Sequence, residues 1–227
     1  MVREFDALPL RDIARKPRVG VVGEILVKFH PDANNHVIDV IEDEDCEAVL
    51  PGMLPFFLMG MYSARFRSDA LGVGERSVAL KRLAVWVVEQ YQRPVARALR
   101  RCGGKFDLPP RMADLAAKAD GIISLGTLAG EGWLLTAEMI ELIEAGAPNI
   151  VCAQPFACLP NHVVGKGMFA ELRRRHPEAN IVAVDYDPGA SETNQLNRIK
   201  LMVATAHKRH RGGERSATIE PIRPPPR

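Results

Sequence analysis

The sequence predicts an α/β fold with an open, mainly parallel sheet and helices on both faces. Residues 18–29 form a nearly continuous apolar run, which is typical of a strand buried on both faces. From residue 119 onward, short apolar runs alternate with longer stretches of helical periodicity, which favours right-handed crossovers between parallel strands. At 227 residues the chain can bury a substantial core. Together these observations predict a lobe of the flavodoxin-like or Rossmann-like kind.

The first part of the chain gives the less regular signals. Residues 1–16 mix charges with isolated apolar positions and predict an N-terminal arm, either a lead-in helix or an extended segment. The run 18–29 is predicted as the first core strand. Residues 37–62 then predict a short strand, an acidic turn around Cys46 and a mainly apolar helix.

A long helix and a regular alternation make up the rest of the prediction. Residues 74–101 place apolar side chains three and four positions apart, which predicts a helix that Pro94 should bend or divide. The α/β lobe is expected to cover residues 17–208, and the basic, proline-containing tail 209–227 is expected to be disordered. Within the lobe, strands are predicted at 119–126, 149–153 and 180–187, and helices at 130–147, 161–176 and 191–210.

Composition excludes several classes of function. Thirty basic and 28 acidic residues leave a net charge of +2, which gives no electrostatic case for a nucleic-acid partner. The most apolar segment, residues 49–62, is shorter than the roughly 20 residues that a membrane-spanning helix needs. Residues 1–16 lack the apolar core of a secretory signal. We therefore expect a cytoplasmic protein whose four cysteines remain free thiols.

Ligands of open parallel sheets bind beyond the carboxyl ends of the strands, so the loops at that edge are the candidate sites. Gly20 and Gly23 do not have the spacing of the dinucleotide-binding fingerprint, and we interpret them as close-packing positions. The Gly-Lys-Gly triplet at 165–167 lacks the spaced glycine and the Ser or Thr of a phosphate-binding P-loop. A nucleotide site of either kind is therefore not predicted.

Two further loops have more than one interpretation. The stretch GTLAGEGW, residues 126–133, either receives an anion at the start of the following helix or simply forms a turn. Together with Lys166 it could hold a small anion or a CoA-type ligand, although Lys166 alone is best explained as a surface charge. Asp185 and Asp187 indicate a cap of the closing helix, with a catalytic acid or base as the alternative.

Cys152 and Cys158 are the most chemically suggestive pair in the chain. Thiolates bind iron and zinc, but a six-residue step matches no common cluster motif. Cys152 lies inside an apolar run, where a small core residue is the simpler interpretation. Cys158 follows Pro155 and is better placed to leave the core. His162 is interpreted as an early-helix residue near that thiol, with metal binding as the alternative.

Four long stretches together resemble a known family. They are similar to the C-terminal part of large proteins related to the 2-hydroxyacyl-CoA dehydratase activators, which join an ATPase activator-like region to a dehydratase-like region. The resemblance covers most of residues 17–206. The stretches are VGVVGEILVKFHPDANN, GTLAGEGWLL, AGAPNIVCAQPFACLPNHVVGKGMF and ANIVAVDYDPGASETNQLNRIKLM.

This resemblance implies a cofactor and its ligands. In the dehydratase-like family, cysteines of separate subdomains hold an iron–sulfur cluster, and an ATP-dependent activator supplies it with an electron. By resemblance, Cys158 is the first candidate metal ligand and Cys152 is the second. Glu24 and Lys28 would lie on a loop that faces the cluster or the substrate. The expected cofactor-binding residues are Glu24, Lys28, Gly130 and Glu131.

The resemblance is incomplete in one respect that affects function. A [4Fe–4S] cluster is usually held by four thiolates, and the sequence offers no convincing set of four. We therefore expect a lobe of a dehydratase-like or double-cubane-type reductase that is inactive alone. Its expected partners are another dehydratase-like subdomain or subunit and an ATP-dependent activator, with a CoA thioester as a further candidate. The alternative is a non-catalytic interaction or scaffold domain that has lost the cluster.

Overall fold

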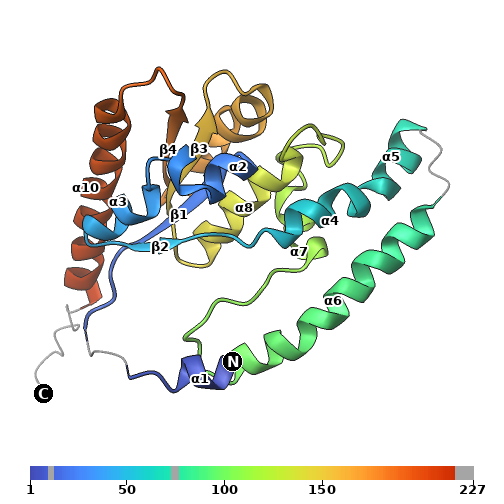
Figure 1. Cartoon of the computed structure of the whole chain (residues 1–227), viewed down its shortest axis with the longest axis horizontal. Helices are drawn as coiled ribbons and strands as arrows, with labels where there is room; N and C mark the ends of the chain where they lie inside the picture. The colour runs from blue at the N-terminus through green and yellow to red at the C-terminus, as the bar shows by residue number, and fades with distance from the viewer. Residues whose placement is uncertain (10–12, 73–76, 218–227) are drawn as a thin grey trace, which may run out of the picture.

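The computed structural model confirms the predicted α/β class, and it describes residues 1–9, 13–72 and 77–217 (Figure 1). Its sheet has four parallel strands in the order β2-β1-β3-β4. Strand β1 follows the arm, and β3 lies beside it at the centre of the sheet. The strands are β1 (Arg18–Gly23), β2 (Glu47–Val49), β3 (Asn149–Pro155) and β4 (Asn180–Tyr186).

Helices cover both faces of the sheet and build an additional layer beside it (Figure 1). The α-helices are α1 (Val2–Asp6), α2 (Ile25–Phe29), α3 (Val37–Asp43), α4 (Leu54–Tyr62), α5 (Ala64–Leu71), α6 (Val78–Arg100), α7 (Met112–Ala119), α8 (Gly132–Glu144), α9 (Phe169–Arg175) and α10 (Glu192–Ala217). Three short turns complete the set: the 3-10 turns η1 (Pro31–Ala33) and η3 (Lys166–Met168), and the π turn η2 (Asn161–Gly165).

Side-chain alternation along the strands explains why both faces are covered. In β3, Ile150 and Cys152 point to the face packed by α8 and α9, whereas Val151 and Ala153 point to the face packed by α2, α3 and α10. All four side chains are fully buried. Burying one aliphatic side chain of this kind stabilises a fold by about 1.5–3 kcal/mol. The apolar residues 150–153 of β3 therefore pack alternately into two cores, one on each face of the sheet.

A third core joins the helical layer to the sheet. Trp133 at the start of α8 is fully buried among α4, α6 and α7, and its Nε1 donates a hydrogen bond to Ser63 Oγ at 3.0 Å. Helix α6 runs as one continuous helix through Pro94, so of the two predicted effects of this proline, a bend or a division, the division does not occur. Only Val85 of α6 is buried among the described residues.

The two glycines of β1 have packing roles. A Cβ at Gly20 would lie 2.6 Å from Leu142 Cδ1, because α8 presses directly on the strand at this point. A Cβ at Gly23 would lie 1.8 Å from the carbonyl oxygen of Ala153, and Gly23 has a φ of +136°. The sequence interpretation of both glycines as close-packing positions is confirmed.

In the first half, the predicted first core strand is confirmed over Arg18–Gly23 but is shorter than expected, and the strand predicted before the acidic turn is wrong. The run 18–29 ends as a strand at Gly23 and continues as helix α2. Residues 37–40 belong to helix α3, whose first amide, that of Val37, donates a hydrogen bond to Asn34 Oδ1 at 3.1 Å. The strand of this region, β2, comes after the acidic turn instead of before it.

The strand predicted at 119–126 is also absent. The amides of Ile122 and Ile123 both donate to the carbonyl oxygen of Ala119, which closes α7 and leaves a turn. At the C-terminus, α10 continues to Ala217, so residues 209–217 of the predicted disordered tail are helical. Residues 218–227 lie outside the described residues. The N-terminal arm contains the short helix α1 followed by irregular chain in its described part.

Candidate functional site

The candidate site lies at the carboxyl edge of the sheet, where the loops after β1 and β3 meet the start of α8. Glu131 joins these three segments. Its Oε1 accepts a hydrogen bond from the Ile25 amide at 3.0 Å, and its Oε2 accepts one from Asn161 Nδ2 at 2.7 Å. The Glu131 side chain is buried. The structure therefore brings the predicted residue Glu131 to the position at which ligands of parallel sheets bind.

Glycines allow this close approach of the loops. Gly130 has a φ of +58°, and a Cβ there would lie 3.0 Å from Pro160 Cβ. Gly132 has a φ of +52°, and a Cβ there would lie 2.3 Å from the carbonyl oxygen of Thr127. The predicted cofactor residue Gly130 thus has a backbone role that holds the α8 loop against the loop of Cys158.

The start of α8 does not offer free amides to an anion. The amides of Gly132, Trp133 and Leu134 donate to backbone carbonyl oxygens of the same loop. Of the two interpretations of GTLAGEGW, the structure therefore supports a turn. Glu24 similarly serves its own helix, since its carboxylate accepts a hydrogen bond from the Val27 amide at 2.8 Å and caps α2.

Lys28 differs most from its predicted position. We expected it on a loop facing the cluster or substrate, but it lies in α2 with only 3% of its surface exposed. Its Nζ donates to both carboxylate oxygens of Glu138, at 2.9 and 3.1 Å. Burial raises the pKa of the Glu138 carboxyl, and the Lys28 ammonium opposes this effect. Lys28 and Glu138 thus form a buried ion pair that joins α2 to α8.

Cys158 lies on the irregular segment that follows β3. The preceding residue, Ala157, has a φ of +58°, which is uncommon for a residue with a side chain. The Cys158 thiol is half-buried, and Asn161 Nδ2 donates to its Sγ at 3.2 Å. His162 Nδ1 donates to the carbonyl oxygen of Cys158 at 2.8 Å. This short turn therefore holds the thiol at the edge of the sheet.

Two buried amide side chains at this edge are incompletely hydrogen-bonded. Gln154 Nε2 donates to Asp185 Oδ1 at 2.7 Å, as Asn161 Nδ2 does to Glu131. Since a carboxylate only accepts, both amide orientations are fixed. Gln154 Oε1 and Asn161 Oδ1 then have no hydrogen-bond partner among the described residues, although both side chains are fully buried. A buried polar atom that stays without a partner costs about 1–3 kcal/mol, so both oxygens are acceptors whose burial a hydrogen-bond donor would make less costly.

The same contacts fix the protonation of His162. Its Nδ1 carries the proton, because a carbonyl oxygen can only accept it. Its Nε2 then accepts from Gln154 Nε2, at a distance of 3.4 Å. In this tautomer the imidazole lone pair points towards Gln154, and His162 lies in the turn η2 next to Cys158, which supports its interpretation as an early-helix residue near that thiol.

The other cysteines lie in different surroundings. Cys152 is fully buried in β3, and a Cβ built on Gly165 would lie 3.3 Å from its Sγ. Burial raises the pKa of the Cys152 thiol to about 12, which supports its interpretation as a core residue. Burial also raises the pKa of Cys46, to about 11. Among the described residues, no group of three or more His, Cys, Asp or Glu side chains could hold a metal ion.

Neither Asp185, near the end of β4, nor Asp187, just after it, caps α10 as predicted. Asp185 is engaged with Gln154, and Asp187 Oδ2 accepts a hydrogen bond from the Gly189 amide at 3.2 Å within its own turn. An open groove of about 650 Å³ lies beyond this edge, lined by Phe156, Asp185, Ala190, Ser191, Asn194, Gln195, Asn197, Arg198 and Leu201. Asp185 thus accepts a hydrogen bond from the buried amide of Gln154 and also lines this groove.

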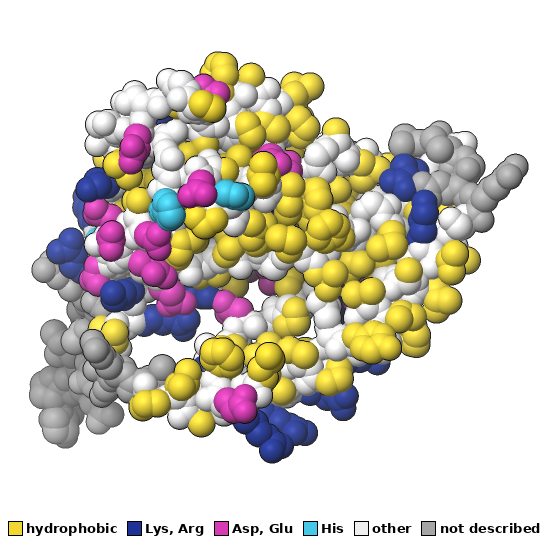
Figure 2. Space-filling view, viewed as in Figure 1, with side chains coloured by type: hydrophobic (Ala, Val, Ile, Leu, Met, Phe, Trp, Pro, Cys, Tyr) yellow, Lys and Arg dark blue, Asp and Glu magenta, His cyan; other side chains and the backbone are white. Residues whose placement is uncertain are grey.

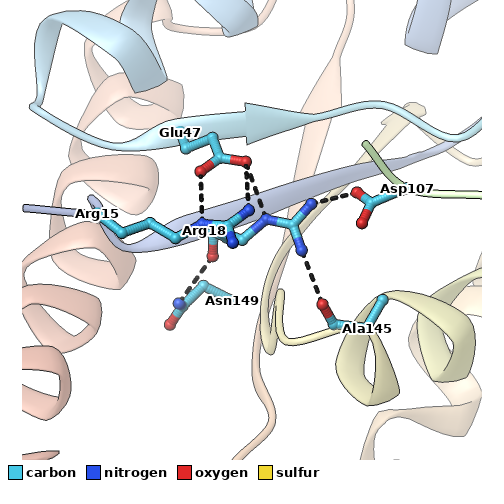
Figure 3. A network of polar contacts seen from close by, with 6 residues as sticks. All are labelled: Arg15, Arg18, Glu47, Asp107, Ala145 and Asn149. Carbon is cyan, nitrogen blue, oxygen red and sulfur yellow. Dashed lines mark hydrogen bonds and ion pairs between the residues drawn. The ribbon is translucent and has the colours of Figure 1, made fainter. Parts of the chain in front are cut away.

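The opposite, amino edge of the sheet carries a second polar cluster (Figure 3). Arg18, at the start of β1, donates to Glu47 Oε1 at 3.0 Å and to the carbonyl oxygen of Ala145 at 2.7 Å. Its third nitrogen contacts the Asp107 carboxylate. Asn149 Nδ2 donates to the Arg18 carbonyl oxygen at 3.0 Å. The cluster ties β1, β2, α8 and the loop before α7 together.

Sequence reasoning missed Gln154, Asn161 and Glu138. Gln154 and Glu138 could have been noticed as polar residues inside otherwise apolar elements, which must find partners when they are buried. Asn161 gives no comparable signal. Its importance follows from contacts with a residue 30 positions away.

Comparison with known proteins leaves the resemblance as a prediction. No protein-family model, no curated protein and no solved structure matches the chain. In the described part of the chain, no helix has both the length and the apolar character needed to cross a membrane.

Proposed function

We propose that the chain is one lobe of an iron–sulfur dehydratase-like or double-cubane-type reductase system, with Cys158 as a thiolate ligand at the carboxyl edge of the sheet. The observation that carries the proposal is the position of this thiol. It is half-buried on the segment after β3, at the edge where two buried oxygens have no donor among the described residues. Another dehydratase-like subdomain or subunit would supply the missing donors and the remaining ligands.

The residues around Cys158 fit a cluster ligand. Thiolate is the usual protein ligand of such clusters, and hydrogen bonds to the sulfur are one way in which proteins adjust reduction potential. Asn161 supplies one N–H to Cys158 Sγ while its other contact, with Glu131, fixes its orientation. Cys152 does not share this arrangement, because its thiol belongs to the core.

Each residue then has a specific task. Cys158 would bind the cluster, and Asn161 orients its sulfur by a hydrogen bond. Glu131 accepts hydrogen bonds from Asn161 and from the first amide of α2 and so fixes both. The oxygens of Gln154 and Asn161 accept N–H or O–H groups from the partner and thereby exclude water from the joint. A bound cluster would supply one-electron transfer at low potential. An ATP-dependent activator would be the electron source, in a reducing cytoplasm where all four thiols stay free.

Anaerobic reconstitution tests the proposal. The full chain would be incubated with iron and sulfide, alone and in the complex that it forms with a dehydratase-like partner, and bound iron would be measured. Cys158→Ser should abolish the iron that depends on this chain, whereas Cys152→Ser should retain it. Unchanged iron in Cys158→Ser within the complex would remove the ligand assignment.

One observation favours a non-catalytic interaction domain as the second candidate. Of the four cysteines, only Cys158 lies at the carboxyl edge with a half-exposed thiol, while the other three are buried. A lobe that keeps its partner but has lost its cluster would show the same arrangement. Such a lobe would form the complex without contributing iron, and Cys158→Ser would leave the activity of the complex unchanged.

A further inference from the structure

Helix α6 presents an apolar stripe to the outside of the molecule. The stripe, called here the α6 seam, is formed by Leu80, Leu83, Val87 and Tyr91, which are 65%, 53%, 37% and 81% exposed. Steps of three and four residues place these side chains on one face of the helix. Figure 2 shows apolar side chains along the outward side of α6, in the same orientation as Figure 1.

The fold of the chain does not explain this seam. The inner side of α6 already packs against α4 and α7 through Val85 and Val88. A surface helix normally has one apolar stripe, which faces its own core, and a polar outer side. Because α6 has a second stripe on its outer side, burial within the described fold accounts for only one of the two.

A row of arginines lies beside the seam on the same helix. Arg82, Arg93, Arg97 and Arg100 are exposed, and none of them has a carboxylate partner in the described part of the chain. The single acid of α6, Glu89, is already engaged, because its Oε1 accepts a hydrogen bond from the Met112 amide at 3.1 Å. The seam is therefore bordered by positive charge that the fold does not balance.

We infer that the α6 seam binds an amphipathic helix of another protein or domain, whose leucine-type stripe covers the seam and whose acidic residues face the arginine row. Apolar burial would supply affinity, and the charges would set orientation and partner choice. A second copy of this chain fits poorly, since it would bring the same four exposed arginines to the interface, and the Glu89 carboxylate is already engaged with the Met112 amide. The inference is independent of the carboxyl edge, because α6 lies in the helical layer away from the ends of β3 and β4 (Figure 1).

Designed peptides can test this partner chemistry. The probe is a fluorescent helical peptide of about 20 residues with leucines on one face and glutamates along the flank. A second peptide carries lysines in place of the glutamates, and a third is a scramble of the first. Fluorescence polarisation with the full chain should show saturable binding of the acidic peptide, about tenfold or more tighter than that of the other two. Equal binding of the acidic and basic peptides, or none at all, would overturn the inference.

Variants separate the seam from the arginine row. Leu83→Ser combined with Val87→Ser should weaken binding of the acidic peptide about tenfold or more. Leu201→Ser is the matched control, because Leu201 is an equally exposed leucine, at 74%, on α10. Arg93→Glu combined with Arg97→Glu should reverse the preference and favour the basic peptide. Circular dichroism verifies that each variant remains folded. If preference does not reverse, the charge pairing is wrong.

Sedimentation of the chain alone tests the rival occupant. We expect a species whose mass does not depend on Leu83 or Val87. A dimer that dissociates in the Leu83→Ser, Val87→Ser variant would show that a second copy covers the seam, and the proposal of an acidic partner would be abandoned.

Discussion

The two edges of the sheet differ in how completely their buried polar side chains are hydrogen-bonded. Strand β3 begins with one buried amide side chain, Asn149, and has another, Gln154, one residue before its end at Pro155. Asn149 donates to Arg18 and accepts from Asn180 Nδ2 at 2.9 Å, so both of its polar atoms are used. Gln154 uses its nitrogen, but its oxygen has no partner among the described residues.

This difference distinguishes polar side chains that are fully used within the fold from polar side chains that still have acceptor atoms to offer. At the amino edge, the Arg18 cluster closes on itself and ties four segments together (Figure 3). At the carboxyl edge, the polar atoms are equally well positioned but the set is incomplete. Folded proteins leave few buried polar atoms without partners, and those that remain are often found at sites where something binds. This contrast is the basis of our proposal that the carboxyl edge carries the function, while the amino edge stabilises the fold.

The largest expected effect concerns the buried ion pair of Lys28 and Glu138. These two charges are paired with each other, whereas Gln154 Oε1 and Asn161 Oδ1 have no hydrogen-bond partner among the described residues. Lys28→Met leaves the Glu138 carboxylate buried without its cation, and should lower the free energy of unfolding by about 3–5 kcal/mol. Urea denaturation measures this change in the free energy of unfolding. The double variant with Glu138→Leu should recover most of this loss, because no unpaired charge remains. If Lys28 instead serves a cofactor, the double variant would be stable but would lose bound iron.

The amino edge gives the next largest effect. Arg18→Met removes three hydrogen-bonded contacts of a side chain that is 9% exposed, and should cost about 2–4 kcal/mol of stability. Thermal unfolding measures the loss. Arg198→Met is the matched control, since its guanidinium makes a single contact, with the Ala183 carbonyl oxygen, and should cost less. A negligible effect of Arg18→Met would remove the structural role of the amino edge.

Thiol reactivity compares the edge with the core. At pH 8, Cys158 should react with a disulfide reagent about 100-fold faster than Cys152, because a thiol with a pKa of about 12 remains protonated. Cys152→Ser and Cys158→Ser assign the kinetic phases.

The pKa of the Cys152 thiol is higher in the folded chain than in the unfolded chain, so the folded chain holds this proton more tightly. The free energy of unfolding should therefore fall as the pH rises above the ordinary thiol value of 9.0.

The smallest effect is expected at the unsatisfied amide. Gln154→Met removes one good hydrogen bond to Asp185 together with the oxygen that has no partner, so the two changes nearly cancel and stability should change by about 1 kcal/mol or less. Asn149→Leu, at the other end of the same strand, should cost distinctly more. Equal costs at the two positions would contradict the difference between the edges.

The sequence predicted most of the second half of the fold. Strand β3, helix α8, strand β4 and helix α10 were all expected, because periodicity is strong there. The errors occur where short apolar runs suit either a strand or a helix. Residues 25–29 and 37–40 are helical instead. Glu24 caps the first of these helices and Asn34 accepts a hydrogen bond from the first amide of the second, and periodicity does not reveal either contact.

The candidate site could be predicted only in part. Cys158 and Glu131 were expected at the carboxyl edge, and the structure places them there. The position of Lys28 was not predictable, because its partner Glu138 is 110 residues away in sequence. The contacts that orient the amides of Gln154 and Asn161 were not predictable either, because their partners Asp185 and Glu131 are 31 and 30 residues away in sequence.

Whether Cys158 binds a cluster is decided by iron content after anaerobic reconstitution of the complex with its dehydratase-like partner. Four single variants would be compared with the parent chain: Cys46→Ser, Cys102→Ser, Cys152→Ser and Cys158→Ser. We expect only Cys158→Ser to lose the iron that this chain contributes, with the complex still assembled. Full iron in Cys158→Ser, or an equal loss in Cys152→Ser with its fold intact, would contradict the assignment of function to the carboxyl edge.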